Sequence, residues 1–328
     1  MSLSRHTFVH KFNNILNMKD YIEHLIASSD ELEKELEKDY DAGTGICPAI
    51  IKPEILCIGL GNGGKKAINS LKDENVQNTV FEHFGWNDRS VFWKKEMLDL
   101  LEENIPQDNA CIYDSIPETE RPLITVFILD INENIDIEKT GYFINEIRTG
   151  FPHTRIIVMV TNRTAKNDSR YITIRNILSP AIDCICVSYL EAESEELVNP
   201  NAVNTDMVKD FIKMTATSGN LNIDISSVID FIEKSDTGCS EVCYYSSYGK
   251  NMKDAADAVI NRYGKNIQRN KGLIYIEGAN EDLCIDGINR ICQYNILDNF
   301  LFGIKSVRQS VDKTIKICIF TKENQNIQ

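Results

Sequence analysis

The sequence predicts an α/β domain with a parallel sheet, followed by a smaller α+β domain. Apolar runs without alternation, such as 123–129, indicate strands that are buried on both faces. Helical segments alternate with these strands at the spacing that right-handed crossovers between parallel strands require. After Gly219 the order of the elements changes, and two strands come last. We therefore expect three parts, namely a helical N-terminal arm at 1–50, the α/β domain at 51–219 and the α+β domain at 220–328.

Local signals justify the elements of the first two parts. Few helix breakers interrupt the N-terminal arm, which is expected to be helical to about residue 40. Pro53 and Gly59 bound the first strand, at 54–58. Pro200 lacks a backbone N–H group and restricts the helix before the second domain to 205–217. The other expected elements are strands at 79–84, 123–129, 155–160 and 182–187 and helices at 64–71, 92–103, 141–149 and 170–178.

The α+β domain is expected to contain two helices and four strands. Apolar residues recur at helical spacing between Ala255 and Ile260, which predicts a helix with one buried face. The last two strands follow one another closely, so we expect them to form a hairpin. The expected elements are, in order, strand 241–246, helix 252–262, strand 273–276, helix 285–294 and strands 301–307 and 314–320.

Composition and charge exclude several functions. The chain has 328 residues and carries 35 Lys and Arg against 49 Asp and Glu, a net charge of −14 at pH 7. Such a surface repels nucleic-acid backbones and anionic membranes, so neither is an expected partner. No apolar stretch reaches about 18 residues, so we expect no signal peptide, no membrane insertion and a cytoplasmic location. The ten cysteines lack C-x-x-C spacing and the five histidines form no cluster, which predicts buried, reduced thiols and no metal site.

A glycine-rich segment joins the first strand to its helix. It comprises Gly59, Gly61, Asn62, Gly63, Gly64, Lys65 and Lys66. Glycine lets backbone N–H groups approach a phosphate closely, and a helix N-terminus adds about half a positive charge. These residues are therefore candidates for binding a phosphate group, and a tight turn without a ligand is the alternative. The segment also satisfies G-x-G-x-x-G, with Glu82 in the position of an acidic ribose partner, which leaves a dinucleotide-binding site as a further interpretation.

The glycine-rich segment and the second domain together resemble the FtsZ/tubulin superfamily. Gly59–Asn69 resembles the first nucleotide-binding loop of FtsZ, where a glycine run leads into an Ala-Val-Asn helix start. Residues 218–227 resemble the loop that FtsZ inserts into the nucleotide site of the next subunit. Three segments are similar to the FtsZ C-terminal domain, namely 273–278, 285–291 and 302–304. The resemblance implies an FtsZ/tubulin-like fold, assembly with itself or with another FtsZ/tubulin-like protein, and GTP or GDP with Mg²⁺ as the ligand.

Two functional elements of the superfamily are altered in this sequence. The second phosphate loop, G-G-G-T-G-T-G, corresponds to 130–139, which contains no glycine and four carboxylates. Carboxylates repel phosphate, and the β-branched Ile135 and Ile137 do not adopt the positive φ angles that glycine supplies. In the inserted loop FtsZ has two acidic residues three positions apart that polarise water. Only Asp224 is present here, with Ser227 at the partner position, and Asp224 has a second interpretation as the N-cap of the following helix.

These features predict an FtsZ/tubulin-like cytoskeletal or cell-division protein with a degenerate nucleotide site and no efficient GTPase activity. The alternative is a GTP-binding and GTP-hydrolysing protein that uses the glycine-rich segment, with Mg²⁺ bridged by Asp130 or Asp136. The third candidate is a dinucleotide-binding oxidoreductase. If the protein is an enzyme, the resemblance implies a GTPase.

Overall fold

A computed structural model describes much of the chain, with six helices and nine strands in the described residues. The predicted arm at 1–50, the predicted helix at 92–103 and, apart from Ile291, the predicted helix at 285–294 lie outside these residues. None of the helices in the described stretches is long and apolar enough to cross a membrane. The described residues are 54–72, 76, 79–84, 122–134, 136–189, 205–216, 223–234, 238–267, 270–278, 291, 297–306 and 314–322.

The described residues fall into two compact units, and each is considered by itself. The α/β unit holds the described residues up to 216 together with 232–244. The C-terminal unit holds 223–231 and the described residues from 245 onward. The division therefore falls inside a strand, between Tyr244 and Tyr245. The expected domain boundary at residue 219 stays a prediction.

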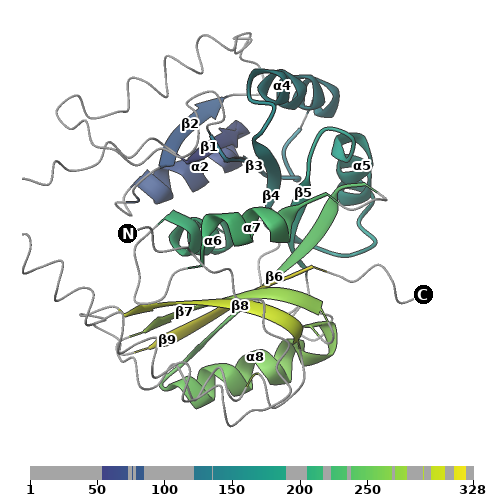
Figure 1. Ribbon diagram of the computed structural model, residues 1–328. Helices are drawn as coiled ribbons and strands as arrows, with labels where there is room; N and C mark the ends of the chain where they lie inside the picture. The colour runs from purple at the N-terminus through teal and green to yellow at the C-terminus, as the bar shows by residue number, and fades with distance from the viewer. Residues whose placement is uncertain are drawn as a thin grey trace, which may run out of the picture. The chain divides into compact units, whose positions relative to one another are not determined.

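Parallel strands and crossover helices build the α/β unit (Figure 1). The strands are hydrogen-bonded in the order β2-β1-β3-β4-β5-β6, and each of these pairings is parallel. This arrangement confirms the predicted α/β class. The strands are β1 (Ile55–Leu60), β2 (Thr79–Phe84), β3 (Ile124–Leu129), β4 (Arg155–Thr164), β5 (Cys184–Tyr189) and the first half of β6 (Ser240–Gly249). The helices are α2 (Gly61–Lys72), α4 (Ile137–Gly150), α5 (Ser169–Leu178) and α6 (Asp206–Ala216).

Helices cover both faces of this sheet, as the unbroken apolar sequences of its strands predict. All residues of β1 and β3 are buried. On one face, Leu56 and Phe127 belong to an apolar cluster with Ile144 of α4 and Tyr171 of α5. On the opposite face, Ile68 of α2 lies against β1 at Gly59. The core of the unit is therefore two apolar layers with the strands between them.

Side-chain caps determine where two of these helices begin. The carboxylate of Asp136 accepts a hydrogen bond from the N–H of Lys139 at 3.1 Å, at the start of α4. The carboxylate of Asp168 accepts from the N–H groups of Arg170 at 2.8 Å and Tyr171 at 3.2 Å, at the start of α5. These bonds satisfy N–H groups that have no partner within the helix.

A buried carboxylate joins the last turn of α4 to the start of β4. Asp183 is 3% exposed and accepts hydrogen bonds from Arg148 Nη2 at 2.7 Å and from the N–H of Ile156 at 2.8 Å. A buried carboxylate is tolerated when it is paired and hydrogen-bonded in this way. Asp183 therefore fixes the connection between α4 and the sheet.

The six cysteines in the described residues are buried and form no disulfide bond, so their position in the core is the one that the sequence predicts. Burial raises the pKa of Cys57 above the ordinary thiol value. Burial also raises the pKa of Cys186, whose sulfur lies 3.5 Å from the sulfur of Met207. Such thiols stay neutral and behave as small apolar side chains.

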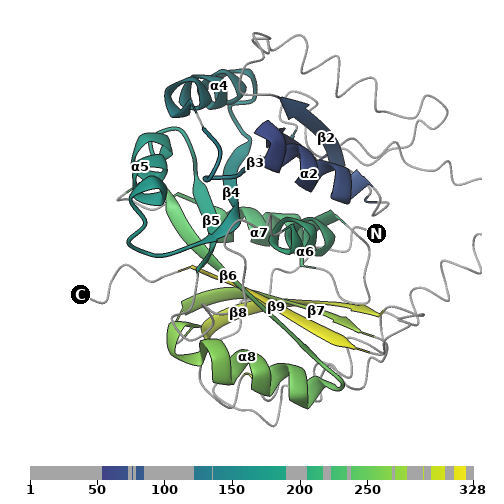
Figure 2. The ribbon, with the colours of Figure 1, turned by 180° about the vertical axis from the view of Figure 1, so that it is seen from behind.

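The C-terminal unit is built on a mixed sheet. Its strands are hydrogen-bonded in the order β6-β9-β7-β8, and α8 runs along them (Figure 2). The predicted hairpin is wrong, because β9 pairs antiparallel with β7 and β8 pairs parallel with β7 on its other side. The elements are α7 (Ile225–Ile232), α8 (Met252–Ile267), β7 (Asn270–Gly278), β8 (Leu297–Ser306), β9 (Ile315–Lys322) and the second half of β6.

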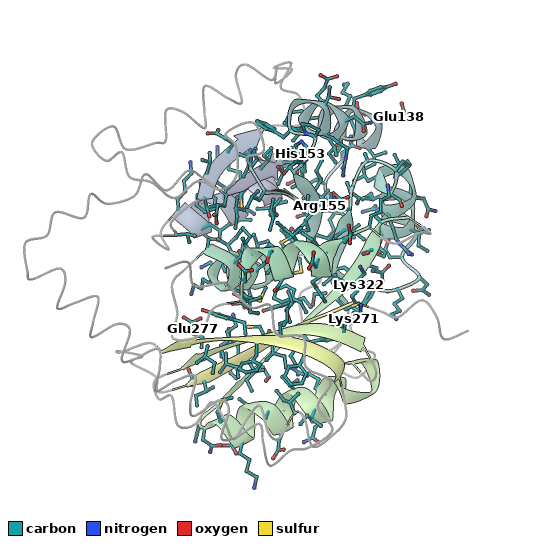
Figure 3. The ribbon with its side chains drawn as sticks, in the orientation of Figure 1. Glu138, His153, Arg155, Lys271, Glu277 and Lys322 are labelled. Atoms are coloured by element: carbon teal, nitrogen blue, oxygen red, sulfur yellow. The ribbon has the colours of Figure 1, made fainter. Side chains whose placement is uncertain are left out.

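The sequence of β9 explains its position inside the sheet. Six of its eight residues are buried, as expected of a strand with a neighbour on each edge. In the antiparallel register with β7, Leu273 lies opposite Phe320. Charged residues are confined to the ends of the pairing, where Lys271 lies opposite Lys322 and Glu277 marks the other end (Figure 3).

Candidate functional site

The glycine-rich segment forms a sharp junction between β1 and α2. The strand ends at Leu60 and the helix begins at Gly61, which has a φ angle of 68°. The expected helix start at Gly64 is therefore wrong, since Gly61 to Gly64 form the first turn of the helix. A Cβ atom on Gly59 would lie 2.5 Å from the carbonyl oxygen of Gly64. These two glycines allow strand and helix to approach more closely than any side chain would permit.

A carboxylate from the segment after β3 binds the first N–H groups of α2. Glu133 Oε2 accepts from the N–H of Asn62 at 3.1 Å, and Oε1 accepts from the N–H of Gly63 at 2.5 Å. Adjacent N–H groups at a helix N-terminus are the donors that a phosphate group uses. A phosphate at this position would have to displace the carboxylate of Glu133.

A short turn after β3 places Glu133 at the helix. Asp130 Oδ1 accepts from the N–H of Asn132 at 2.8 Å, and the Asp130 carbonyl oxygen accepts from the N–H of Glu133 at 3.2 Å. Asp130 is buried, and a Cβ atom on Gly63 would lie only 2.4 Å from its Cβ. The turn therefore rests directly on the helix at Gly63, where only glycine fits.

The other two carboxylates of this segment lie at the start of α4. Asp136 caps the helix and forms an ion pair with Lys139, its Oδ2 lying 2.9 Å from Nζ. The hydrogen bonds from the side chain and the backbone of Lys139 lower the pKa of Asp136. Glu138 is exposed in the first turn of α4 (Figure 3). Among the residues that the structure describes, no three His, Cys, Asp or Glu side chains are grouped to hold a metal ion.

The two lysines of the glycine-rich segment lie on α2, and the predicted ribose partner Glu82 lies on β2. Lys65 and Lys66 are exposed on the helix. Glu82 lies on β2, the strand next to β1. His83 Nε2 lies 3.1 Å from the carbonyl oxygen of Gly61, a contact that the sequence did not indicate. The register of the two parallel strands, which places His83 beside Gly59, brings the histidine to this position.

Asp224 belongs to the C-terminal unit, where it directly precedes α7. Its carbonyl oxygen accepts from the N–H groups of Ser227 at 3.0 Å and Val228 at 3.2 Å. Its exposed carboxylate accepts a hydrogen bond from the hydroxyl of Ser226. Ser227 is buried. Asp224 thus stands at the position before the first helical residue, and an N-cap role for its side chain stays a prediction.

A second polar cluster in the α/β unit lies between β5, β6 and α5. The hydroxyl of Tyr189 donates to Glu241, and Arg175 Nε lies 3.2 Å from the other oxygen of that carboxylate. The hydroxyl of Tyr171 lies 3.5 Å from that of Tyr189. Burial, followed by the charge of Glu241, raises the pKa of Tyr171. These side chains provide hydrogen-bond and ion-pair partners for one another, so we interpret the cluster as a network that stabilises the fold.

Comparison with known proteins shows the fold. No family model matches the chain, and no curated protein matches it. CetZ from Methanosaeta thermophila strain DSM 6194 superposes with a TM-score of 0.50 at 10% identity, over 83% of this chain and 87% of that one. CetZ2 from Haloferax volcanii, in a GTPγS-bound protofilament, superposes with a TM-score of 0.53 at 12% identity, over 83% and 94%. Both are FtsZ/tubulin-superfamily proteins, so the chain has the FtsZ/tubulin-like fold that the sequence resemblance predicted.

Proposed function

We propose that this protein is an FtsZ/tubulin-like cytoskeletal or cell-division protein that assembles without efficient GTP hydrolysis. The shared fold, which extends over most of this chain and of CetZ2, supports the general kind of protein. The CetZ2 structure is that of a protofilament. For this chain we propose association with copies of itself or with another FtsZ/tubulin-like protein.

The contact of Glu133 with the N–H groups of Asn62 and Gly63 carries the proposal for a degenerate nucleotide site. Two like charges about 4 Å apart repel by about 1 kcal/mol in bulk water and by about 4 kcal/mol near a protein surface. A triphosphate in the usual pose of the superfamily would meet this repulsion and would also lack the glycine donors of the second loop. These residues therefore do not fit GTP as it binds in the superfamily.

The residues of the inserted loop also argue against efficient GTP hydrolysis. Asp224 is present, but the position three residues later is Ser227, which is buried and uncharged. A serine hydroxyl does not act as a base near neutral pH. Ser227 therefore cannot replace the second carboxylate that polarises water in FtsZ.

The test is a GTP titration by calorimetry, with and without Mg²⁺, together with phosphate release and sedimentation velocity on the same preparation. We expect no micromolar binding, no turnover, and species larger than the monomer that increase with protein concentration and do not respond to GTP. Micromolar binding or turnover would instead support the GTPase alternative. A strictly monomeric protein at high concentration would contradict assembly, and enhanced NAD(P)H fluorescence would support an oxidoreductase.

A further inference from the structure

We infer that the carboxylate of Glu133 occupies the position of a phosphate group at the glycine-rich segment. It thereby prevents external anions from binding to the N–H groups at the start of α2. This inference deepens the proposed function and rests on it in one respect, the premise that the first turn of α2 corresponds to a phosphate-binding position. The rest of the argument depends only on contacts within the α/β unit.

The geometry of the contact is that of an anion bound at a helix N-terminus. The two oxygens of Glu133 accept from two successive N–H groups, of Asn62 at 3.1 Å and Gly63 at 2.5 Å. Hydrogen bonds to a charged acceptor are about twice as strong as neutral ones, and the helix dipole adds to the attraction. The Glu133 side chain is half-buried, so solvent screens this attraction only in part.

The position of Glu133 is fixed by the core of the unit. Leu129 and Ile131, on either side of Asp130, are both buried in the apolar cluster between the sheet and helices α4 and α5. The turn that follows is held by the two hydrogen bonds to Asp130. Glu133 therefore extends from an anchored turn, so little conformational entropy is lost when it binds α2.

This arrangement reverses the role of the segment after β3. In the superfamily the segment supplies N–H donors to a phosphate, whereas here it supplies an acceptor to the donors of α2. The donors and the acceptor thus satisfy each other within one unit. We therefore expect the glycine-rich segment to keep its structure when no nucleotide is present.

The experiment is rescue by an added anion after Glu133→Ala, which leaves the two N–H groups without their acceptor. We expect the variant to melt about 5 °C below the parent protein. Inorganic pyrophosphate at about 10 mM should recover at least about half of that loss, because a ligand that binds only the folded state stabilises it. The parent protein should show no shift under the same conditions, with ionic strength held constant by KCl.

The matched control is Glu138→Ala, which removes the same charge from an exposed position at the start of α4. It should melt within about 1 °C of the parent and should not respond to pyrophosphate. Equal responses of the parent and Glu133→Ala, or an unchanged melting temperature without a pyrophosphate response, would overturn the inference. If Glu133→Ala does not fold, the pyrophosphate response of Glu133→Gln decides in the same way.

Failure of this inference can be distinguished from failure of the proposed function. GTP binding or turnover by the parent protein counts against the proposed function. The pyrophosphate response of the Glu133 variants is measured without GTP and without any assay of assembly.

Discussion

Replacing Gly63 by alanine should destabilise the protein, although the same change in a helix is usually favourable. Helix propensity alone would give a gain of up to about 1 kcal/mol. The new Cβ would lie 2.4 Å from Asp130 Cβ, so the turn after β3 must move, at a cost of about 1–3 kcal/mol for overpacking. That movement also breaks the two hydrogen bonds that the Glu133 carboxylate accepts from α2, each worth about 1.5 kcal/mol or more. With both hydrogen bonds lost, the expected net loss is about 3–5 kcal/mol.

Gly141→Ala provides the matched control for Gly63→Ala. Gly141 lies within α4, and the nearest atom to an added Cβ is Leu178 Cδ2 at 3.8 Å, an ordinary contact. This variant should therefore gain about 1 kcal/mol from helix propensity. Urea unfolding followed by circular dichroism measures both changes. A Gly63→Ala protein as stable as Gly141→Ala would refute the close approach of the turn to α2.

Three further predictions concern caps, buried charge and thiols. Asp168→Ala should destabilise the protein by about 1 kcal/mol in urea unfolding through loss of the α5 cap, whereas Ser169→Ala, exposed at the next position, should change little. Asp183→Ala should cost about 3 kcal/mol in the same assay, because it leaves two donors without an acceptor, and Asp183→Asn should cost less. Cys57, whose pKa burial raises above 9.0, should resist iodoacetamide at pH 8 when folded, as peptide mass spectrometry would show. Its contribution to stability is complete below about pH 9 and is lost at higher pH, because only the unfolded thiol ionises there.

The parallel α/β unit could be predicted because its signals are local. The run from Ile55 to Ile58 is apolar throughout and ends at Gly59, so both the strand and its end are evident from the sequence. The strands that follow share this pattern, and alternation with helices then determines their direction. The pairing of β9 could not be obtained in this way, since a hairpin and an inserted strand have the same order along the chain.

The contact that defines the candidate site is long-range. Glu133 and Asn62 are 71 residues apart, and nothing in their local sequences indicates that they meet. The sequence showed only that the segment after β3 has carboxylates where the superfamily has glycines. The negative charge of these carboxylates by itself predicts only that they repel phosphate. Only the fold shows that one of these carboxylates is already bound to the N–H groups.

The place of β9 in the C-terminal sheet has a consequence for synthesis on the ribosome. This strand follows β8 along the chain but lies between β6 and β7, so those two strands cannot be joined until residue 322 has left the exit tunnel. Until then the unpaired edges of β6 and β7 are exposed, which is the situation that favours aggregation of nascent chains. A chain that stops before Ile315 should therefore be a substrate for chaperones and proteases.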